Sequence, residues 1–443
     1  MRALTKAVTA ILLLFFLFTA PSTAAIKSIK IRSDNRPVIL FRKFGFTNTG
    51  NLSIAISNLS VTSTKSPYDP SRIGFFLLWD QTLIQRVLLE VEQNPDFCIV
   101  DSIFLSLLFT FRDIPAKHSS FNLSYPVTYP DEYTLLFANC NPQSFVTMDV
   151  RTELYNIYDE TTKDYLSVGL TKLPSLYLII SLIYINFLAI WIRVCFKNRR
   201  SVHRIHLLMG ALLTMQAVSM FCNAEERRHV KATGTPQGWD VTFYVFRFIN
   251  SVLLFIVTVL IGAGWWYLKP FLQKKENIFL MIMIPFQVLS DVASIVMDET
   301  GPSSKDWATW NQVYMVNDAI CRCAVLFPIV WSIRSLKESS KTDDKAGRNL
   351  SLFTQFFRLV VGYLWLPKIC VFALESIVDY TNIWVFSATE EISTLLFYLV
   401  MFFMFRPVEE DHEYFVVDNE SLNLKAIPTG MQTDEHEVQE GRY

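Results

Sequence analysis

The sequence of 443 residues lacks net charge and has few charged side chains. Forty Lys and Arg residues face 41 Asp and Glu residues, which leaves a formal net charge of −1, and charged residues make up only 18% of the chain. Without a global basic field there is no general attraction for nucleic acid, so we expect no nucleic-acid partner. Hydrophobic residues reach 51%. That composition excludes an ordinary soluble enzyme and is typical of membrane proteins.

The sequence also lacks the common catalytic and nucleotide-binding motifs. It contains no His-Glu-x-x-His, no Gly-x-Ser-x-Gly, no Walker loop and no dinucleotide fingerprint. His203 and His206 could touch a common ligand, but a helix-cap and packing role suits them better. Cys321 and Cys323 lack further ligands nearby, which favours packing over metal binding. We therefore expect no enzymatic activity, no cofactor and no metal.

What the sequence does contain is a dense series of apolar runs in its second half. Each of seven runs has roughly 20 residues, enough to cross a hydrocarbon core of about 30 Å as a helix. The runs are 174–196, 205–223, 241–261, 278–297, 313–333, 356–378 and 383–405. The sixth contains Arg358, Lys368 and Glu375, so neighbouring helices must shield these charges. We expect a seven-helix bundle over residues 174–406.

The N-terminus has the layout of a secretory signal peptide. Arg2 and Lys6 precede an apolar stretch at 10–18, and small residues follow up to Ala25. The interpretation is a signal peptide at 1–24 and a lumenal mature N-terminus; the alternative is an uncleaved anchor. Seven spans then leave residues 407–443 as a cytosolic tail.

The basic residues between the spans agree with this orientation. The loops assigned to the cytosol carry Lys197, Arg199, Arg200, Arg204, Lys269, Lys274, Lys275, Arg334, Lys337, Lys341, Lys345 and Arg348. The opposite loops mix both signs or are short and acidic. An excess of Lys and Arg in short cytosolic loops is the usual bias of membrane proteins.

Residues 25–173 have a different pattern, in which short strand-like segments alternate with turn clusters. The predicted strands are 26–31, 38–41, 52–56, 73–78, 103–111, 133–137 and 145–150, with one helical insertion at 83–92. Seven short strands separated by Ser, Asn, Asp and Pro favour an antiparallel β-sandwich. The predicted fold is thus a lumenal β-sandwich domain followed by a seven-helix transmembrane bundle.

A lumenal location of residues 25–173 makes their cysteines candidates for a disulfide and their sequons candidates for glycosylation. Cys98 and Cys140 are the two cysteines of residues 25–173, and an oxidising compartment would let them form a disulfide, although two buried thiols remain an alternative. Sequons at Asn51, Asn58 and Asn122 fall in the same region, so these are the candidate N-glycosylation sites. Similar matches at 349 and 419 fall on the cytosolic side.

Charged residues inside the spans define a candidate cavity that faces the lumen. They are Arg247, Asp291, Asp318, Arg322, Lys368, Glu375, Glu390 and Glu391, and all lie at or on the lumenal side of their span midpoints. Asp318 and Arg322, one turn apart, can form an ion pair. Lys368 would then meet Glu390 or Asp291. Three interpretations remain open, namely an ion-pair lattice that sets helix register, a pocket for a lipid, peptide or glycan ligand, and proton or ion conduction.

Several ordered motifs resemble one known family. They are RPVILFRKFGF at 36–46, HRIHLLM at 203–209, GTPQGWD at 234–240, LKPFL at 268–272, AVLFPIVWSI at 324–333 and YFVVD at 414–418. On these motifs the chain is similar to the lung seven-transmembrane receptor family, also called Golgi-dynamics-domain seven-transmembrane (GOST) proteins, and to its plant branch of candidate G-protein-coupled receptors. The resemblance implies a lumenal β-sandwich on seven helices, residence in Golgi and endosomal membranes, and a trafficking role.

Three classes of function follow as hypotheses. The first is a trafficking protein or cargo receptor, in which Tyr414 and Val417 form a Tyr-x-x-hydrophobic motif of the kind read by clathrin adaptors. The second is a receptor, at the plasma membrane, that binds the α subunit of a heterotrimeric G protein through the basic loop 334–348. The third is a cation channel or transporter.

Overall fold

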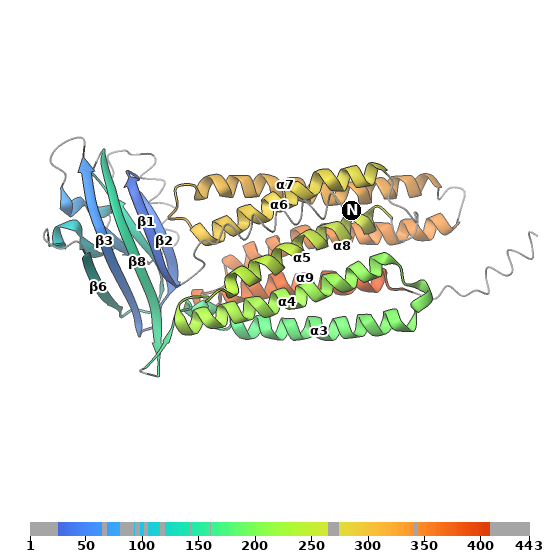
Figure 1. Cartoon of the computed structure of the whole chain (residues 1–443), viewed down its shortest axis with the longest axis horizontal. Helices are drawn as coiled ribbons and strands as arrows, with labels where there is room; N and C mark the ends of the chain where they lie inside the picture. The colour runs from blue at the N-terminus through green and yellow to red at the C-terminus, as the bar shows by residue number, and fades with distance from the viewer. Residues whose placement is uncertain are drawn as a thin grey trace, which may run out of the picture.

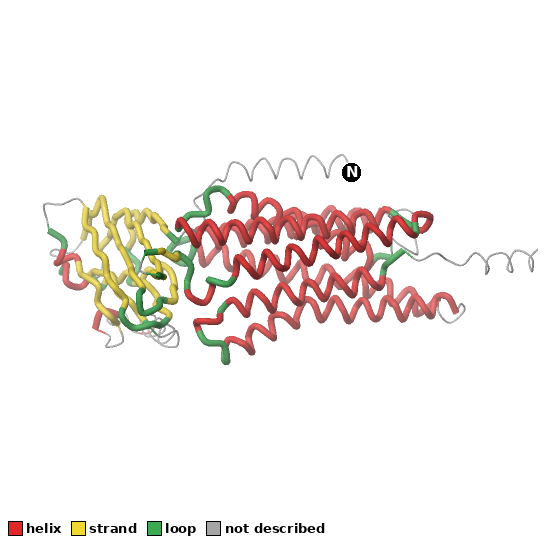
Figure 2. The backbone as a smooth tube through the Cα atoms, turned by 90° about the horizontal axis from the view of Figure 1, so that it is seen from below, coloured by secondary structure: helices red, strands yellow, loops and turns green. Residues whose placement is uncertain are grey.

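The structure is a computed structural model that describes residues 25–63, 69–79, 93, 98–101, 105–115, 120–141, 143–159, 161–264, 274–339 and 344–407. The predicted signal peptide, the helical insertion at 83–92, and the tail with Tyr414 and Val417 lie outside the described residues. Figure 1 shows a strand domain at one end of a bundle of long helices, and Figure 2 shows the same division from a second direction.

In the described residues of the N-terminal domain, nine strands form two sheets. They are β1 (Ile26–Asp34), β2 (Val38–Gly45), β3 (Gly50–Ser63), β4 (Ile73–Leu78), β5 (Leu105–Thr110), β6 (Ser120–Val127), β7 (Glu132–Asn139), β8 (Ser144–Tyr158) and β9 (Thr162–Asp164). One sheet has the order β1-β8-β3-β6 with β9 on β8, and the other β2-β7-β4-β5. Their pairings are antiparallel, which confirms the predicted sheet class.

Two strands, β6 and β9, were not predicted from the sequence pattern, and each has a chemical reason. β6 has the sequence SFNLSYPV, whose Ser, Asn and Pro residues are typical of turns, and it lies at the edge of its sheet, where Pro is tolerated. β9 has three residues and extends a hairpin with β8. In both cases pairing with a long neighbouring strand outweighs a weak local preference.

The strand domain has its main core between the sheets. Alternate residues of β3 point inward, including Leu52, Ile54 and Ile56, each at most 2% exposed. Phe75 of β4 has its ring centroid 5.3 Å from that of Phe109 and 5.2 Å from that of Phe137. Offset aromatic pairs of this kind contribute about 0.5–1.5 kcal/mol each beyond their buried area.

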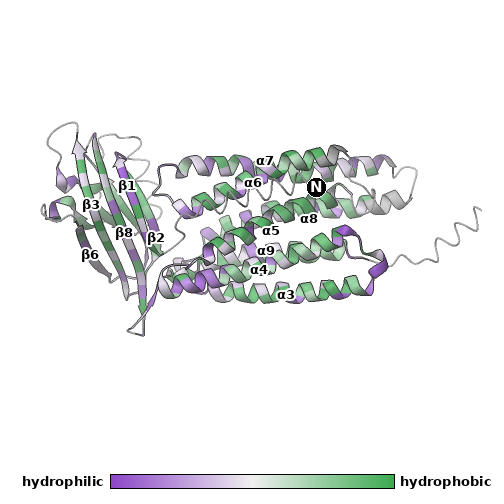
Figure 3. Cartoon of the chain, viewed as in Figure 1, coloured by the Kyte–Doolittle hydropathy of each residue, from purple (hydrophilic) through white to green (hydrophobic). Residues whose placement is uncertain are grey.

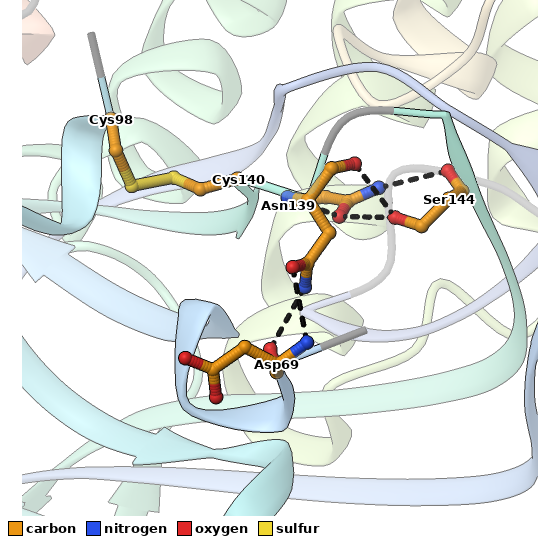
Figure 4. Close-up of a disulfide and its surroundings, with 6 residues drawn as sticks. Asp69, Cys98, Asn139, Cys140 and Ser144 are labelled. Carbon is orange, nitrogen blue, oxygen red and sulfur yellow. Dashed lines mark hydrogen bonds between the residues drawn. A yellow bond between two sulfur atoms is a disulfide. The ribbon is translucent and has the colours of Figure 1, made fainter. Parts of the chain in front are cut away.

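The outer face of β4 is covered too, which explains its continuous apolar sequence IGFFLL. Phe76 and Leu78 pack there in a small cluster with Ile99. Cys98, beside Ile99, forms a disulfide with Cys140, which is 42 positions later in the sequence, and their Cα atoms are 5.5 Å apart. Figure 4 shows this disulfide beside the Asn139–Ser144 turn, where the Ser144 hydroxyl donates to the Asn139 side-chain oxygen at 2.8 Å.

Seven helices follow the strand domain. They are α3 (Leu173–Lys197), α4 (Arg204–Thr233), α5 (Trp239–Gly262), α6 (Lys274–Thr300), α7 (Trp307–Ser339), α8 (Asp344–Glu375) and α9 (Trp384–Met404). Within the described residues these seven are long and apolar enough to cross a membrane, as predicted. The sixth ends at Glu375 and not at 378. The helix ribbons are coloured mostly as hydrophobic in Figure 3, and the side chains of Ile179, Phe372 and Phe403 are more than half exposed.

Helix α4 extends ten residues beyond its predicted end at 223. The added segment, AEERRHVKAT, is polar but rich in good helix formers. It ends at Gly234, whose φ of 75° is left-handed and whose N–H donates to the Val230 oxygen at 2.9 Å. A hydropathy window ends where the sequence becomes polar, whereas the helix continues out of the apolar layer to reach the strand domain.

This extension of α4 holds the start and the end of the strand domain. The Ile26 N–H donates to the Gly234 oxygen at 3.1 Å, and the Tyr165 N–H donates to the Lys231 oxygen at 3.1 Å. The Lys231 ammonium also lies 3.5 Å from the Asp164 carboxylate. Asp164 is 3% exposed and the Lys231 side chain 38% exposed, so the pair places a buried acceptor against a partly solvated cation.

The connection between α6 and α7 makes a second contact with the strand domain. The Lys27 ammonium donates to the main-chain oxygens of Glu299 and Thr300, both at 2.9 Å, where the free carbonyls of α6 attract a cation. The Arg36 guanidinium donates to the Ser303 oxygen at 2.7 Å and pairs with the buried Asp34 carboxylate at 2.9 Å. These bonds fix the loop along the edge of β1.

The connection between α8 and α9 makes a third contact. This contact runs through residues 167–169, which precede α3: the Gly45 N–H of β2 donates to the Ser167 hydroxyl at 2.9 Å, and a Cβ at Gly169 would clash with the main-chain oxygen of Tyr380 in the α8–α9 connection. Glycine at 169 therefore permits the close approach between the two parts of the chain. Three separate contacts, at α4, α6–α7 and α8–α9, set the strand domain on one end of the bundle.

Asp34 supplies a pH-dependent share of this anchoring. Burial would raise the pKa of its carboxyl, but hydrogen bonds from Arg36 and the charges of Arg36 and Lys305 outweigh burial and hold the pKa below its ordinary 3.8. A lowered folded-state pKa stabilises the fold above the ordinary value, and this stabilisation disappears as pH falls through the folded-state pKa.

We expect Asp34→Asn to lower the free energy of unfolding at pH 7 by about 1–3 kcal/mol, because a buried charged hydrogen-bond acceptor is lost. In nanodiscs, thermal unfolding followed by Trp fluorescence should show a midpoint lower by about 2–6 °C. The difference between variant and wild type should shrink near pH 3. Asp159→Asn, in an exposed turn with φ of 49°, is the control. Equal midpoints at pH 7 would contradict this role of Asp34.

Candidate ligand cavity in the helix bundle

Six of the eight charged residues predicted to face a cavity do line one. The cavity has a volume of about 450 Å³ and is bordered by Arg247 of α5, Asp318 and Arg322 of α7, Lys368 of α8, and Glu390 and Glu391 of α9. Gln287 of α6 completes its wall. The sequence places these residues far apart, and the packing of five helices brings them together.

The basic side of the cavity is a triad around Asp318. Its carboxylate lies 2.6 Å from the Arg322 guanidinium and 3.5 Å from the Lys368 ammonium. The Arg322 guanidinium also donates to the Leu364 oxygen at 3.1 Å. The pairing of Asp318 with Arg322 on one helix face was predicted. Lys368 was expected to meet Glu390 or Asp291; among the described residues its direct ion pair is with Asp318, because α8 packs beside α7, while Glu390 lines the same cavity.

Arg247 is held by α6 at the strand-domain end of the cavity. Its guanidinium lies 3.1 Å from the Asp298 carboxylate and donates to the Ser294 hydroxyl at 3.2 Å. Asp298 follows the predicted span 278–297 and was expected in a loop, so its role was missed. Because α6 continues to Thr300, Asp298 lies one turn above Ser294 on the same helix face.

Asp291 lies behind the cavity wall. One carboxylate oxygen accepts from the Ser251 hydroxyl at 2.9 Å and from the Gln287 amide at 3.2 Å, and both of these residues line the cavity. The other oxygen is buried without a hydrogen-bond partner in the described part of the chain. A carboxylate in this position is costly to bury, so the hydrogen bonds at Oδ1 are essential to it.

Glu375 does not belong to the cavity. It is the last residue of α8 and is exposed, two helical turns beyond Lys368 toward the strand domain. The expectation that it joins the other intramembrane charges is therefore corrected. The helix ends at this point, and a carboxylate at a helix end can reach water without a partner.

The acidic side of the cavity is formed by consecutive residues of α9. Glu390 and Glu391 both line the cavity, and within the described residues neither carboxylate has an ion pair. Carboxylates at this depth require either a wet cavity or a ligand that carries positive charge. The cavity thus has a basic wall on α7 and α8 and an acidic wall on α9.

The end of the cavity away from the strand domain is apolar. Phe255, Val325, Val360 and Phe397 line it, and the Phe397 ring stacks on the Tyr363 ring with centroids 4.2 Å apart. Each of these four apolar residues lies farther from the strand domain than the charged residues of its own or the neighbouring helix, because a helix advances about 1.5 Å per residue. The expected division into a polar upper and an apolar lower part is present.

Uncharged polar residues around the cavity were missed by the sequence analysis. Ser251, Gln287 and Thr394 line it, and the Asn250 amide donates to the Gln216 side-chain oxygen at 2.5 Å between α5 and α4. A search for Asn and Gln within the apolar runs would have found these amides. Hydrogen bonds between helices of this kind contribute about 0.6–2 kcal/mol each in membranes.

The residues considered for metal binding have structural roles. The His206 ring accepts from the His203 N–H at 2.9 Å and caps the start of α4. Cys321 is buried and Cys323 is exposed on α7, so their side chains face different surroundings. Across the described ranges, no three His, Cys, Asp or Glu side chains form a group that could hold a metal.

The three sequon asparagines lie on the β1-β8-β3-β6 sheet. Asn122 and Asn58 are exposed, whereas Asn51 is half-buried and its side-chain oxygen accepts from Ser124 at 2.9 Å. Asn58 has a φ of 54° at an irregularity in β3, and its amide donates to the Asp149 carboxylate at 2.7 Å. Their glycosylation stays a prediction.

Comparisons with known proteins match both parts of the chain. Residues 27–156 match the family described as CAND6/7, N-terminal domain, and residues 172–412 match GOST, seven transmembrane domain. The chain is 46% identical over 418 residues to the protein named Candidate G-protein coupled receptor 6 of Arabidopsis thaliana, and the match covers 92% of this chain and 97% of that protein. A match of this length and identity includes the strand domain, the helices and the order of the two. The chain therefore belongs to the GOST family of seven-transmembrane proteins, in the branch of the candidate G-protein-coupled receptors.

Proposed function

We propose that this protein is a non-enzymatic receptor of secretory and endosomal membranes, which binds a cargo or ligand through its lumenal strand domain and the polar cavity below it. The observation that carries the proposal is the cavity itself, with unpaired Glu390 and Glu391 opposite the triad of Asp318, Arg322 and Lys368. An ion-pair lattice that only sets helix register would leave no unpaired carboxylates around an open volume.

The charges of the cavity favour a ligand that carries both signs. A cationic group would compensate Glu390 and Glu391, and an anionic group would meet Arg322 and Lys368, which share one carboxylate between two cations. The apolar deep end around Phe255 and Phe397 would accept an apolar chain or side chain. Among lipid, peptide and glycan ligands, zwitterionic lipids and short peptides fit this pattern best.

Neutralising the acidic wall should release such a ligand. We expect Glu390→Gln with Glu391→Gln to lower the amount of copurifying lipid or peptide by at least about tenfold, since each lost charged hydrogen bond contributes about 1.5–3 kcal/mol. Mass spectrometry of the purified protein measures this loss. Glu375→Gln, outside the cavity, is the matched control and should retain the ligand. A copurifying set that is identical in both variants would contradict ligand binding at this site.

The proposed residence in Golgi and endosomal membranes, with the N-terminus in the lumen and the C-terminus in the cytosol, rests on the resemblance and on the charge bias of the loops. In this orientation the motif of Tyr414 and Val417 would face clathrin adaptors. Sorting by such a motif depends on the tyrosine side chain and on the hydrophobic residue three positions later.

We expect Tyr414→Ala to move the tagged protein from Golgi and endosomes toward the plasma membrane, because adaptor binding would be lost. Imaging at native expression measures the distribution. Val416→Ala, at a position that the motif leaves variable, is the control and should not change it. An unchanged distribution of the Tyr414 variant would remove the sorting role.

A second candidate function is signalling through a heterotrimeric G protein, favoured by the name of the Arabidopsis relative. The contact would involve the basic residues Lys337, Lys341, Lys345 and Arg348. We expect a purified Gα subunit to bind the full-length protein and to lose binding when these four residues are neutralised. Binding that is equally strong in the neutralised variant, or no binding at all, would exclude this role for the loop.

A further inference from the structure

A second cavity lies between the strand domain and the bundle, outside the site described above. It has a volume of about 370 Å³ and is bordered on one side by β1 from Lys27 to Arg32 and on the other by the α6–α7 loop from Glu299 to Asp306. We call this space the β1 groove. Figure 1 shows β1 at the side of its sheet, close to the turn that joins α6 and α7.

The strand that borders the β1 groove has an unpaired edge. β1 ends its sheet and pairs with β8 on one side. In an antiparallel pair, alternate residues direct both main-chain groups away from the partner. The Ile26 N–H bonds to Gly234 and not to β8, so Ser28 and Lys30, two and four residues later, also direct their main-chain groups outward. In the described part of the chain, no hydrogen bond satisfies the outward groups of Ser28 and Lys30.

The loop opposite this edge is held in place at both ends. The Lys27 ammonium bonds to the Thr300 oxygen at one end. At the other end the Lys305 ammonium bonds to the Ser33 oxygen at 3.2 Å, and Arg36 bonds to the Ser303 oxygen. These bonds keep the loop beside β1 without letting it pair with the strand. Within the described residues, the edge of β1 between Ser28 and Lys30 is therefore left unpaired.

The charge that reaches the β1 groove is mainly positive. Lys30, Arg32 and Lys305 are exposed. Arg32 pairs with the Asp149 carboxylate and Lys305 lies 3.9 Å from the Asp34 carboxylate, whereas Lys30 has no ion pair within the described residues. Among the acidic residues of the lining, Asp34 is 3% exposed and already paired, and Glu299 is 9% exposed. Asp306 is exposed. A basic surface beside a free strand edge is complementary to an extended acidic segment.

We propose that the β1 groove binds an extended peptide segment of a lumenal partner, which adds to β1 as a further strand and carries acidic side chains at alternate positions. Its main chain pairs with the outward groups of Ser28 and Lys30. Its acidic side chains lie on the face of Lys30 and Arg32, and the intervening apolar side chains lie beside Ile29 and Ile31. The inference deepens the proposed receptor role and rests on the lumenal position of the strand domain.

The test uses the purified full-length protein in nanodiscs and a fluorescein-labelled peptide, Gly-Glu-Val-Glu-Val-Glu-Gly, with binding followed by fluorescence anisotropy. We expect binding that weakens with added salt. A peptide with Lys in place of Glu should bind at least about tenfold more weakly, since like charges would face each other. A Glu peptide methylated at alternate main-chain nitrogens should also bind about tenfold more weakly, since it cannot donate its main-chain hydrogen bonds to β1.

Variants of β1 separate the main-chain contact from the charge. Ser28→Pro removes one outward N–H and leaves the bonds of Lys27 and Ile29 to β8, since proline is tolerated on the free side of an edge strand. Lys30→Glu reverses the unpaired charge. We expect each to weaken binding about fivefold or more, by the same hydrogen-bond and charge contributions. Lys43→Glu, exposed on β2 outside the groove, should bind like the wild type.

The outcomes distinguish this inference from the receptor role itself. If the methylated peptide binds as well as the unmodified one, the groove is a plain anion site and strand addition is wrong. If no peptide binds while the ligand of the helix cavity still copurifies in a Glu390-dependent manner, the β1 groove is not a peptide site and the receptor role stands. If the peptide binds but the copurifying ligand does not depend on Glu390, only the ligand site in the helix cavity is rejected.

Discussion

The cost of burying charge between apolar helices is the constraint on which the rest of this structure depends. Arg247, Asp318, Arg322 and Lys368 would each be expensive to bury alone in a membrane. The bundle meets this cost with the Asp318 triad and with the Arg247–Asp298 pair. Within the described residues Glu390 and Glu391 have no ion pair, and the volume beside them is open. The proposed ligand site rests on this difference between the paired and the unpaired charges.

The strand domain and the cavity are connected through the end of α6. Asp298 pairs with Arg247 on the cavity side, and the main-chain oxygens of Glu299 and Thr300 accept from Lys27 of β1. The last turn of α6 therefore contacts both Arg247 of the cavity in the helix bundle, through Asp298, and β1, through Glu299 and Thr300. A change in the position of α6 at one site would alter the geometry at the other. This physical continuity is what a receptor needs if an event at the strand domain is to affect the bundle.

Much of the candidate site followed from elementary arguments about helices. The ion pair of Asp318 with Arg322 depends on residues four positions apart, and that spacing always lies on one helix face. The partner of Lys368 depends on which helix packs beside α8, which the spacing does not contain. Asp298 was overlooked because the end of a helix outside the apolar layer has no hydropathy signal. Asn250 and Gln216 were overlooked because an argument from buried charge considers only ionisable side chains, and these amides carry no charge.

The order of the chain was readable from composition, because a membrane span needs about 20 apolar residues and a two-layer strand domain needs alternation with turns. The seven spans, the antiparallel sheets and the disulfide of Cys98 with Cys140 were therefore all anticipated. The contacts between distant residues were not, because they depend on how whole elements pack. Three such features arise only when helices and sheets pack together in three dimensions. They are the contact of the strand domain with α4, the position of Glu391 and Lys368 on opposite walls of one cavity, and the free edge of β1 beside the α6–α7 loop.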